Sequence, residues 1–541
     1  MKTIHILSAA VLLALTVPAG AQNINQSVQV TNDYLTRFAD FQKQGGDLQV
    51  PDSLLRFDYS FDYSVFDTPY RGSYEFSPYR IDATPAARLS DANRLYLRAG
   101  AGYTFHPELQ FAWRVLDEKN YKIGLTAGAG GYAGPYRTHG GAAFRGHDLW
   151  GRAALDGEYL TDATRWTYGF GYDNVLAGED TDEPSYRSGF HSVIVSGRAH
   201  SRPVAGSSFS YDVDAAYRHS SEVYDPVLNQ TTARESSVHG GFSVGTDLQE
   251  GIRIYADAAL DLDLRRRRDE LFNGKYAAFV AAVTPHVEFV LGPVRLDAGL
   301  RADFGKLTSA QGSFALAPAV TARFDLPDYG LELFAAATGG QALQTHYMLK
   351  QMNHFAYRAN VKPFVAQEKL HLKAGVAGHW RSALQYEVTA GFVDYASQPL
   401  VALGGVNPVD FKSVYLQVRG AWHDARLDVD GGLRVGNCRL PEKANAYAPA
   451  AFTADLRGTY NWQKRIYAGA YLQASSARRS MTDKWLDIAG YADFGLLGEY
   501  RLDRRWTVWA QAGNLFGMAI ERIPGNIEKS PFLTLGFSLK L

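Results

Sequence analysis

The stretch IRIYADAALDLDL, residues Ile252–Leu264, decides the fold class. Isoleucine, alanine and leucine occupy its even positions, while arginine, tyrosine and aspartate occupy most of its odd positions. A period of two places these sets on opposite faces of a β-strand. One continuous apolar face opposite a charged face fits a strand that contacts lipid on one side and water on the other.

The same alternation recurs along the chain, for example over Phe209–Arg218 and Arg426–Val435. Such stretches run to about 10–14 residues, enough to cross a bilayer when tilted, whereas the strands of β-sandwiches usually have about 5–6. Between Leu95 and Leu541 we count about 22 strands, an even number as in single-chain bacterial barrels. The chain ends inside an alternating stretch, Phe532–Leu541, which must pair with the first strand to remove the open edges. The sequence therefore predicts an all-β fold: a transmembrane antiparallel up-and-down β-barrel over residues 94–541, with a short N-terminal extension.

The connections between the strands support a membrane barrel, because short turns alternate with longer polar segments. Turns such as Gly292-Pro293 and Asp503-Arg504-Arg505 are very short. Bacterial barrels place short turns in the periplasm and long loops outside. The segments that we expect to be outer loops are 177–188, 220–234, 340–367, 398–412 and 437–449.

The N-terminus predicts export. Lys2 precedes an apolar core, and Ala19-Gly20-Ala21 has the small-x-small pattern of a signal-peptidase site. We therefore expect residues 1–21 to be a signal peptide that is cleaved after Ala21. Together with the barrel pattern, this predicts residence in the cell outer membrane, in contact with lipid and lipopolysaccharide.

Residues 22–93 lack sustained alternation and are rich in aromatic side chains. The richest part, from Pro69 to Arg80, combines aromatic rings with two arginines, a composition typical of protein interfaces. Such rings must pack against something, so we expect this part to dock either inside the barrel or on another envelope protein. The residues that would dock are Tyr70, Arg71, Tyr74, Phe76, Tyr79 and Arg80.

The C-terminal stretch LGEYRLDRRWTVWAQAGNLF, residues 497–516, resembles the closing hairpin of a TonB-dependent receptor, in which a basic tight turn joins two long strands. The resemblance extends in architecture over Leu95–Leu541 and implies a receptor-like barrel. That family carries a globular plug domain before the barrel, and residues 22–93 are too few to form it. The chain therefore resembles receptor-like barrels without a full plug domain.

Two sets of charged residues are candidate sites. The first should line the lumen and set its preference for solutes, or form a structural lattice of ion pairs; it comprises Arg253, Asp257, Asp261, Arg426, Asp428, Asp430 and Arg434. The second is the run Arg265, Arg266, Arg267 and Arg268, which at an outer strand end could contact the phosphates of lipopolysaccharide or simply be solvated.

Several classes of function are not favoured by the sequence. The net charge of −1 gives no electrostatic case for binding nucleic acid. The Gly-x-Ser-x-Gly match at Gly241–Gly245 lies within an alternating strand, so we expect no enzyme. No metal-ligand spacing is present, and we assign no metal and no cofactor. The single Cys438 excludes an intrachain disulfide.

Two hypotheses for the function remain open. In the first, the barrel takes up or admits an unidentified solute across the outer membrane. In the second, it is a scaffold that does not transport and that docks other envelope proteins through residues 22–93 and its loops.

Overall fold

A computed structural model describes residues 94–138, 141–180, 186–202, 208–224, 232–268, 273–308, 312–356, 362–380, 383–441, 444–482, 486–528 and 531–541. The candidate docking residues between Tyr70 and Arg80, like the predicted signal peptide, lie outside these ranges. Within them the chain is almost entirely strand, as the alternation predicts.

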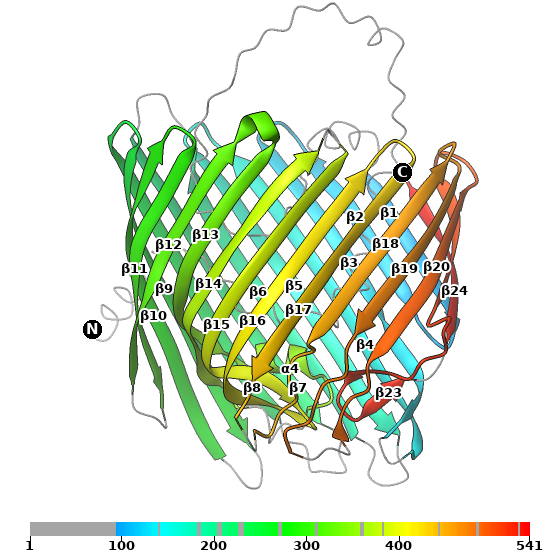
Figure 1. Ribbon diagram of the computed structural model, residues 1–541. Helices are drawn as coiled ribbons and strands as arrows, with labels where there is room; N and C mark the ends of the chain where they lie inside the picture. The colour runs from blue at the N-terminus through cyan, green and yellow to red at the C-terminus, as the bar shows by residue number, and fades with distance from the viewer. Residues whose placement is uncertain are drawn as a thin grey trace, which may run out of the picture.

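The wall of the molecule is a closed antiparallel barrel of 22 strands (Figure 1). These strands are β1 (Leu95–Tyr103), β2 (Glu108–Asp117), β3 (Tyr121–Arg137), β4 (Ala143–Leu160), β5 (Thr164–Asp180), β6 (Tyr186–Ser201), β7 (Phe209–Tyr224), β8 (Thr232–Gln249), β9 (Ile252–Arg268), β10 (Asn273–Leu291), β11 (Val294–Leu307), β12 (Ser313–Leu326), β13 (Leu331–Gln344), β14 (Phe364–Trp380), β15 (Leu384–Ala402), β16 (Gly405–His423), β17 (Leu427–Arg439), β18 (Phe452–Trp462), β19 (Ile466–Ser475), β20 (Tyr491–Arg501), β21 (Trp506–Gly513) and β24 (Phe532–Lys540). Each pairs with its neighbours in chain order, except that β21 pairs with β24. The predicted fold class and strand number are confirmed.

The last strand closes the barrel. β24 pairs antiparallel with β1 from Tyr96↔Lys540 to Tyr103↔Leu533, and on its other side with β21. Both edges of the sheet are thereby removed, so all strand backbone groups can be paired inside the wall.

The outward face of the wall is apolar. In β9, for example, Ile254 and Leu264 are exposed, while Arg253 and Asp263 on the opposite face are buried. Exposed tryptophans gather on the outward face beside the short turns: Trp166, Trp380, Trp462 and Trp506. Tryptophan favours the membrane–water interface, so this end of the barrel lies at one boundary of the bilayer. The described part of the chain contains no helix that is long and apolar enough to cross a membrane.

The two ends of the barrel differ. One, here called the turn end, holds Arg94, Leu541 and short turns such as Leu502–Arg505, where the Asp503 carboxylate accepts backbone hydrogen bonds from Arg505 and Trp506, both 2.7 Å. At the other, the loop end, several predicted loops are wrong. The segment 398–412 belongs mostly to β15 and β16, which meet at a tight turn at Leu403-Gly404. Residues 177–180 and 186–188 continue strands β5 and β6. Polar strand ends that project beyond the bilayer lose the apolar alternation, which explains the error.

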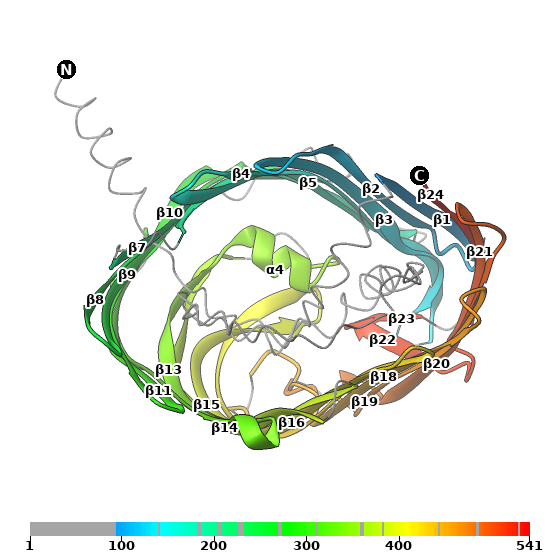
Figure 2. The ribbon, with the colours of Figure 1, turned by 90° about the horizontal axis from the view of Figure 1, so that it is seen from above.

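Two short structures lie inside the ring of strands (Figure 2), near the loop end (Figure 1). One is helix α4 (His346–Met352), in the connection between β13 and β14. The other is the hairpin of β22 (Ile520–Ile523) and β23 (Asn526–Glu528), in the connection between β21 and β24. The short helix η6 (Pro327–Tyr329) forms a turn at the other end.

Aromatic rings lie close to glycines of neighbouring strands along the inner wall. A Cβ atom added to Gly100 or Gly536 would come within 2.4 or 2.3 Å of the Trp509 ring. The Arg98 guanidinium lies 3.7 Å from the centre of that ring and also bonds Glu108 and Glu499. The glycines therefore leave the space that these large side chains fill.

Candidate functional site

Residues 345–356, here called the α4 segment, fold back from the loop end into the barrel. Thr345 caps the helix, since its side chain accepts a hydrogen bond from the Met348 amide. Leu349 and Ala356 are fully buried and pack with Val406 and the partly buried Met352 and Phe364. The apolar side of this segment is thus buried against the rest of the protein.

Two glutamates on the inner wall anchor the start of the segment. The Glu235 carboxylate on β8 accepts hydrogen bonds from the backbone amides of His346 at 2.6 Å and Tyr347 at 3.1 Å. Glu222 on β7 bonds His346 Nε2 and Lys350 Nζ, each at 2.8 Å. A carboxylate beside the first amides of a helix satisfies donors that have no partner within the helix.

The anchor is almost completely removed from solvent. The side chains of Glu222, His346 and Lys350 are 0%, 2% and 1% exposed. Burial, together with the nearby positive charge of Arg265, lowers the pKa of His346, so its ring is neutral at pH 7. Its Nε2–H then donates to Glu222, and the charge of Glu222 is balanced by Lys350.

Further contacts fix the rest of the segment. The Asn353 amide nitrogen donates to the carbonyls of Ala402 and Gly405, at the tight turn between β15 and β16. The Tyr347 hydroxyl donates to Asp173 at 3.1 Å, and the Arg218 guanidinium lies 3.8 Å from the centre of its ring. The α4 segment is therefore attached to both sides of the lumen mainly through side chains.

The β22–β23 hairpin is held in a similar way. Arg522 bonds Glu528 at 2.5 Å within the hairpin and Asp493 on β20 at 3.0 Å. Burial raises the pKa of Glu528, while Arg522 opposes that shift. On its outer side the hairpin pairs with the end of β3 at Ile527↔Arg137.

The two inward structures meet at an aromatic cluster. Phe355 from the α4 segment packs with Tyr136 of β3, and Ile523 of the hairpin packs on the same cluster. Two recesses flank the contact, and both are lined by Gln351 and His354.

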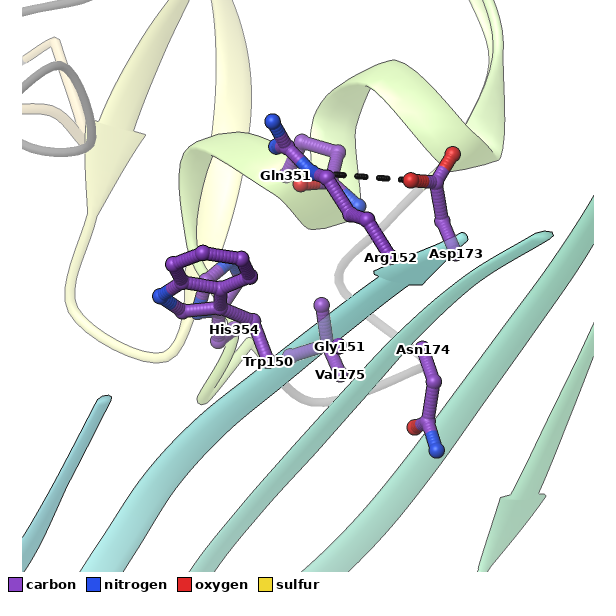
Figure 3. Close-up of a pocket in the computed structure, with 8 residues that line it drawn as sticks. All are labelled: Trp150, Gly151, Arg152, Asp173, Asn174, Val175, Gln351 and His354. Carbon is purple, nitrogen blue, oxygen red and sulfur yellow. Dashed lines mark ion pairs between the residues drawn. The ribbon is translucent and has the colours of Figure 1, made fainter. Parts of the chain in front are cut away.

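The recess against β4 and β5 is lined by both polar and apolar side chains (Figure 3). There Gln351 and His354 face Trp150 and the ion pair of Arg152 with Asp173, at 3.5 Å. His354 Nδ1 bonds Asp148 at 2.7 Å, and its Nε2 has no hydrogen-bond partner in the described residues. At the loop end two inward structures thus meet, with a small recess on either side of their contact.

The predicted lining residues are mostly engaged with neighbouring side chains. His286 lies between Asp257 and Asp297, at 3.1 and 2.7 Å, and His239 bonds Asp261 at 2.7 Å. The other contacts are those of Arg253 with Asp247 and Ser210, Asp428 with His423, and Arg434 with the Tyr415 ring. Asp430 lies in β17 opposite Arg457, and Arg426 is exposed in the turn before β17. These contacts have the form of an ion-pair lattice, one of the two alternatives that the sequence left open.

The arginine run is divided by the pleat of β9. Arg265 is buried on the inner face beside the α4 segment, so it cannot reach lipopolysaccharide and this part of the prediction is wrong. Arg266 is exposed on the outward face. The side chains of Arg267 and Arg268 lie outside the described part. In the described residues no group of three or more His, Cys, Asp or Glu is arranged to hold a metal ion.

Sequence reasoning missed the anchor of the α4 segment. It assigned Glu222 and residues 340–367 to solvated loops, and periodicity does not show which loop folds inward. One signal was available, because His346–Met352 contains apolar side chains that an exposed loop does not need.

Comparison with solved structures decides the fold. The structure aligns with the FrpB iron transporter from Neisseria meningitidis (F5-1 variant) with a TM-score of 0.65 and 9% identity, over 83% of this chain and 82% of that chain. It aligns with the copper transporter OprC with a TM-score of 0.62 and 12% identity, over 83% and 80% of the chains. The chain has the barrel fold of TonB-dependent receptors. For the ferric-catecholate import receptor Fiu from E. coli K12 the TM-score is 0.60 at 9% identity, over 83% and 82%.

At these identities the likeness is one of fold. No protein-family model and no curated protein matches the sequence. The barrel fold places the protein in the outer membrane.

Proposed function

We propose that this barrel passes a solute across the outer membrane, and that the α4 segment closes its lumen at the loop end, which faces the cell exterior. A ring of 22 strands encloses a lumen wide enough for a solute unless it is filled. The observation that carries the proposal is the α4 segment itself, which lies inside the ring and is tied to it through Glu222 and Glu235.

The solved barrels of this fold support uptake as the class of function. Their names describe transport of copper and iron and import of ferric catecholates. We infer that this chain acts on small solutes of that general kind, metals or metal chelates.

The nature of the anchor favours a closure that can be released. Side-chain contacts can be exchanged for water without breaking the wall, because the strand ladders on both sides of the segment remain paired. Because the charges of Glu222 and Lys350 are buried, removing either one should weaken docking of the α4 segment.

The test is solute flux into proteoliposomes, measured by swelling with sugars of increasing size. The variant Glu222→Gln/Glu235→Gln weakens the anchor and should raise the flux. The matched control Asp156→Asn/Glu158→Gln changes two carboxylates on the same face of β4 as Asp148, away from the α4 segment, and should leave the flux unchanged. Unchanged flux in a correctly assembled anchor variant would contradict closure of the lumen by the α4 segment.

The scaffold hypothesis predicts the opposite result. A scaffold keeps its lumen closed whatever happens to the anchor, and it depends on residues 22–93. The triple variant Tyr74→Ala/Tyr79→Ala/Arg80→Ala would then release a co-purifying envelope protein while the barrel melts normally. A lower melting temperature with unchanged partners would mean that these residues pack inside the barrel.

A further inference from the structure

The outward face of β8–β11 differs in charge from the inner face, which holds carboxylates together with arginines such as Arg253, Arg265 and Arg301. On the described part of these strands every carboxylate that is ion-paired or buried lies on the inner face, as its contacts with lumenal side chains show: Glu235, Asp247, Asp257, Asp261, Asp263, Glu288, Asp297 and Asp303. The outward face carries apolar side chains, and at its loop end it carries only cations. The outward cations therefore have no carboxylate beside them on the described part of their own face.

Three of these cations form a row across adjacent strands. Arg234 of β8 is paired in register with Arg266 of β9, and Arg266 with Lys275 of β10. All three are exposed. Neighbouring strands lie about 4.8 Å apart, so the row spans roughly 10 Å of wall.

The row points away from the lumen. Leu264 is on the same face of β9 as Arg266, two residues before it, and is 49% exposed, whereas Arg265 between them is buried inside. On β11, Lys306 continues the outward face beyond the exposed Phe304. The cations thus stand directly above the apolar band that contacts lipid.

The row makes no ion pair with any described residue, although like charges side by side repel one another. Like charges that no described carboxylate neutralises would be stabilised by an anion bound from outside. Guanidinium groups bind phosphate through two parallel hydrogen bonds, and ammonium groups bind it as point charges.

We propose that Arg234, Arg266 and Lys275, with Lys306 beside them, bind the phosphate groups of a lipopolysaccharide molecule in the outer leaflet. The acyl chains of this lipid would lie on the apolar face formed by residues such as Leu264 and Phe304. This site differs from the lipopolysaccharide contact predicted for the four consecutive arginines. Its cations come from neighbouring strands, and not from neighbouring positions in the sequence. The inference rests on the orientation given under the proposed function, with the loop end outside.

The test measures lipopolysaccharide bound to the full-length protein in detergent, by native mass spectrometry and by titration with purified rough lipopolysaccharide. The variant Arg234→Gln/Arg266→Gln/Lys275→Gln should bind roughly a hundredfold more weakly, because each cation at an anionic lipid surface contributes about fivefold. The control Lys464→Gln/Arg465→Gln/Arg504→Gln removes the same charge from the turn end and should bind like the wild type.

Two further measurements distinguish lipid phosphate from free phosphate. Both use wild-type protein, so misfolding of a variant cannot affect them. With wild-type protein, dephosphorylated lipid A should bind as weakly as the triple variant binds lipopolysaccharide, and inorganic phosphate should not compete at millimolar concentration. Equal binding of phosphorylated and dephosphorylated lipid, or wild-type binding by the triple variant, would overturn the site. Because no transport is measured, failure here is distinct from failure of the proposed function.

Discussion

The ammonium nitrogen of Lys350 lies 2.8 Å from Oε1 of Glu222, and both side chains are shielded from solvent. This ion pair joins a loop helix to the inner wall of the barrel. It differs from surface pairs such as Lys412 with Asp394, which has the same 2.8 Å separation but a lysine that is 62% exposed.

We predict that Lys350→Met releases the α4 segment, since it leaves the Glu222 carboxylate buried without its counter-charge. The loss in docking free energy should be about 3–5 kcal/mol. The rate of thiol labelling of a Leu349→Cys reporter measures it. The exposed Lys412→Met control should cost about 0–1 kcal/mol. Slow labelling in both variants would show that the pair does not hold the segment.

Docking of the α4 segment should also depend on pH. Docked His346 has a lowered pKa, so the released segment, with a histidine pKa of about 6.5, binds a proton more readily. Docking is then at full strength above about pH 6.5 and weakens as the pH falls. The groups that face the ring are Glu222 from β7, Glu235 from β8, Arg265 from β9 and Lys350 from the helix.

The same Leu349→Cys reporter tests this, with labelling that accelerates between about pH 6.5 and 5. A His346→Gln variant, which keeps a side-chain donor, should lose this acceleration. If the labelling rate of the reporter that retains His346 does not change with pH, this result would be inconsistent with a neutral, buried His346.

The inner glycines should be intolerant of larger side chains where rings lie on them. Gly536→Ala places a Cβ atom 2.2 Å from the Ala99 carbonyl oxygen and 2.3 Å from the Trp509 ring, and should destabilise the barrel by about 1–3 kcal/mol. Gly498→Ala is the matched control, because nothing lies within 4 Å of its added Cβ. Both are compared by the temperature at which the folded band is lost in unboiled gels, and equal temperatures would count against the packing described.

Removal of the closing strand should prevent assembly. Deletion of residues 532–541 leaves β1 and β21 each without a ladder partner, and open edges are not tolerated in lipid. Deletion of residues 518–528 removes the lumenal hairpin but keeps β24, and should still give a band whose mobility changes on boiling. A heat-modifiable band from the first deletion would refute the role of β24.

The barrel was predictable because each spanning strand repeats one physical constraint, lipid on one face and water on the other, as in Ile252–Leu264. The site was not predictable in the same way. Glu222 and Lys350 are far apart in sequence, and their pairing depends on a loop that folds into the barrel. The local hydrophobic periodicity of the sequence does not indicate which loop does so. The arginine run illustrates both cases: its alternation placed Arg265 and Arg266 on opposite faces, but only the strand register brought Arg234 and Lys275 beside Arg266.

Single-channel conductance in planar bilayers tests the central claim most directly. Four proteins are compared: wild type, a deletion of residues 22–93, the Glu222→Gln/Glu235→Gln variant, and the two changes combined. We predict near-zero conductance for the wild type, an increase when the anchor is weakened, and the largest, open-pore conductance when both changes are present. Conductance that stays near zero in the combined variant, with the barrel assembled and the α4 segment labelled as released, would contradict a lumen that the α4 segment closes.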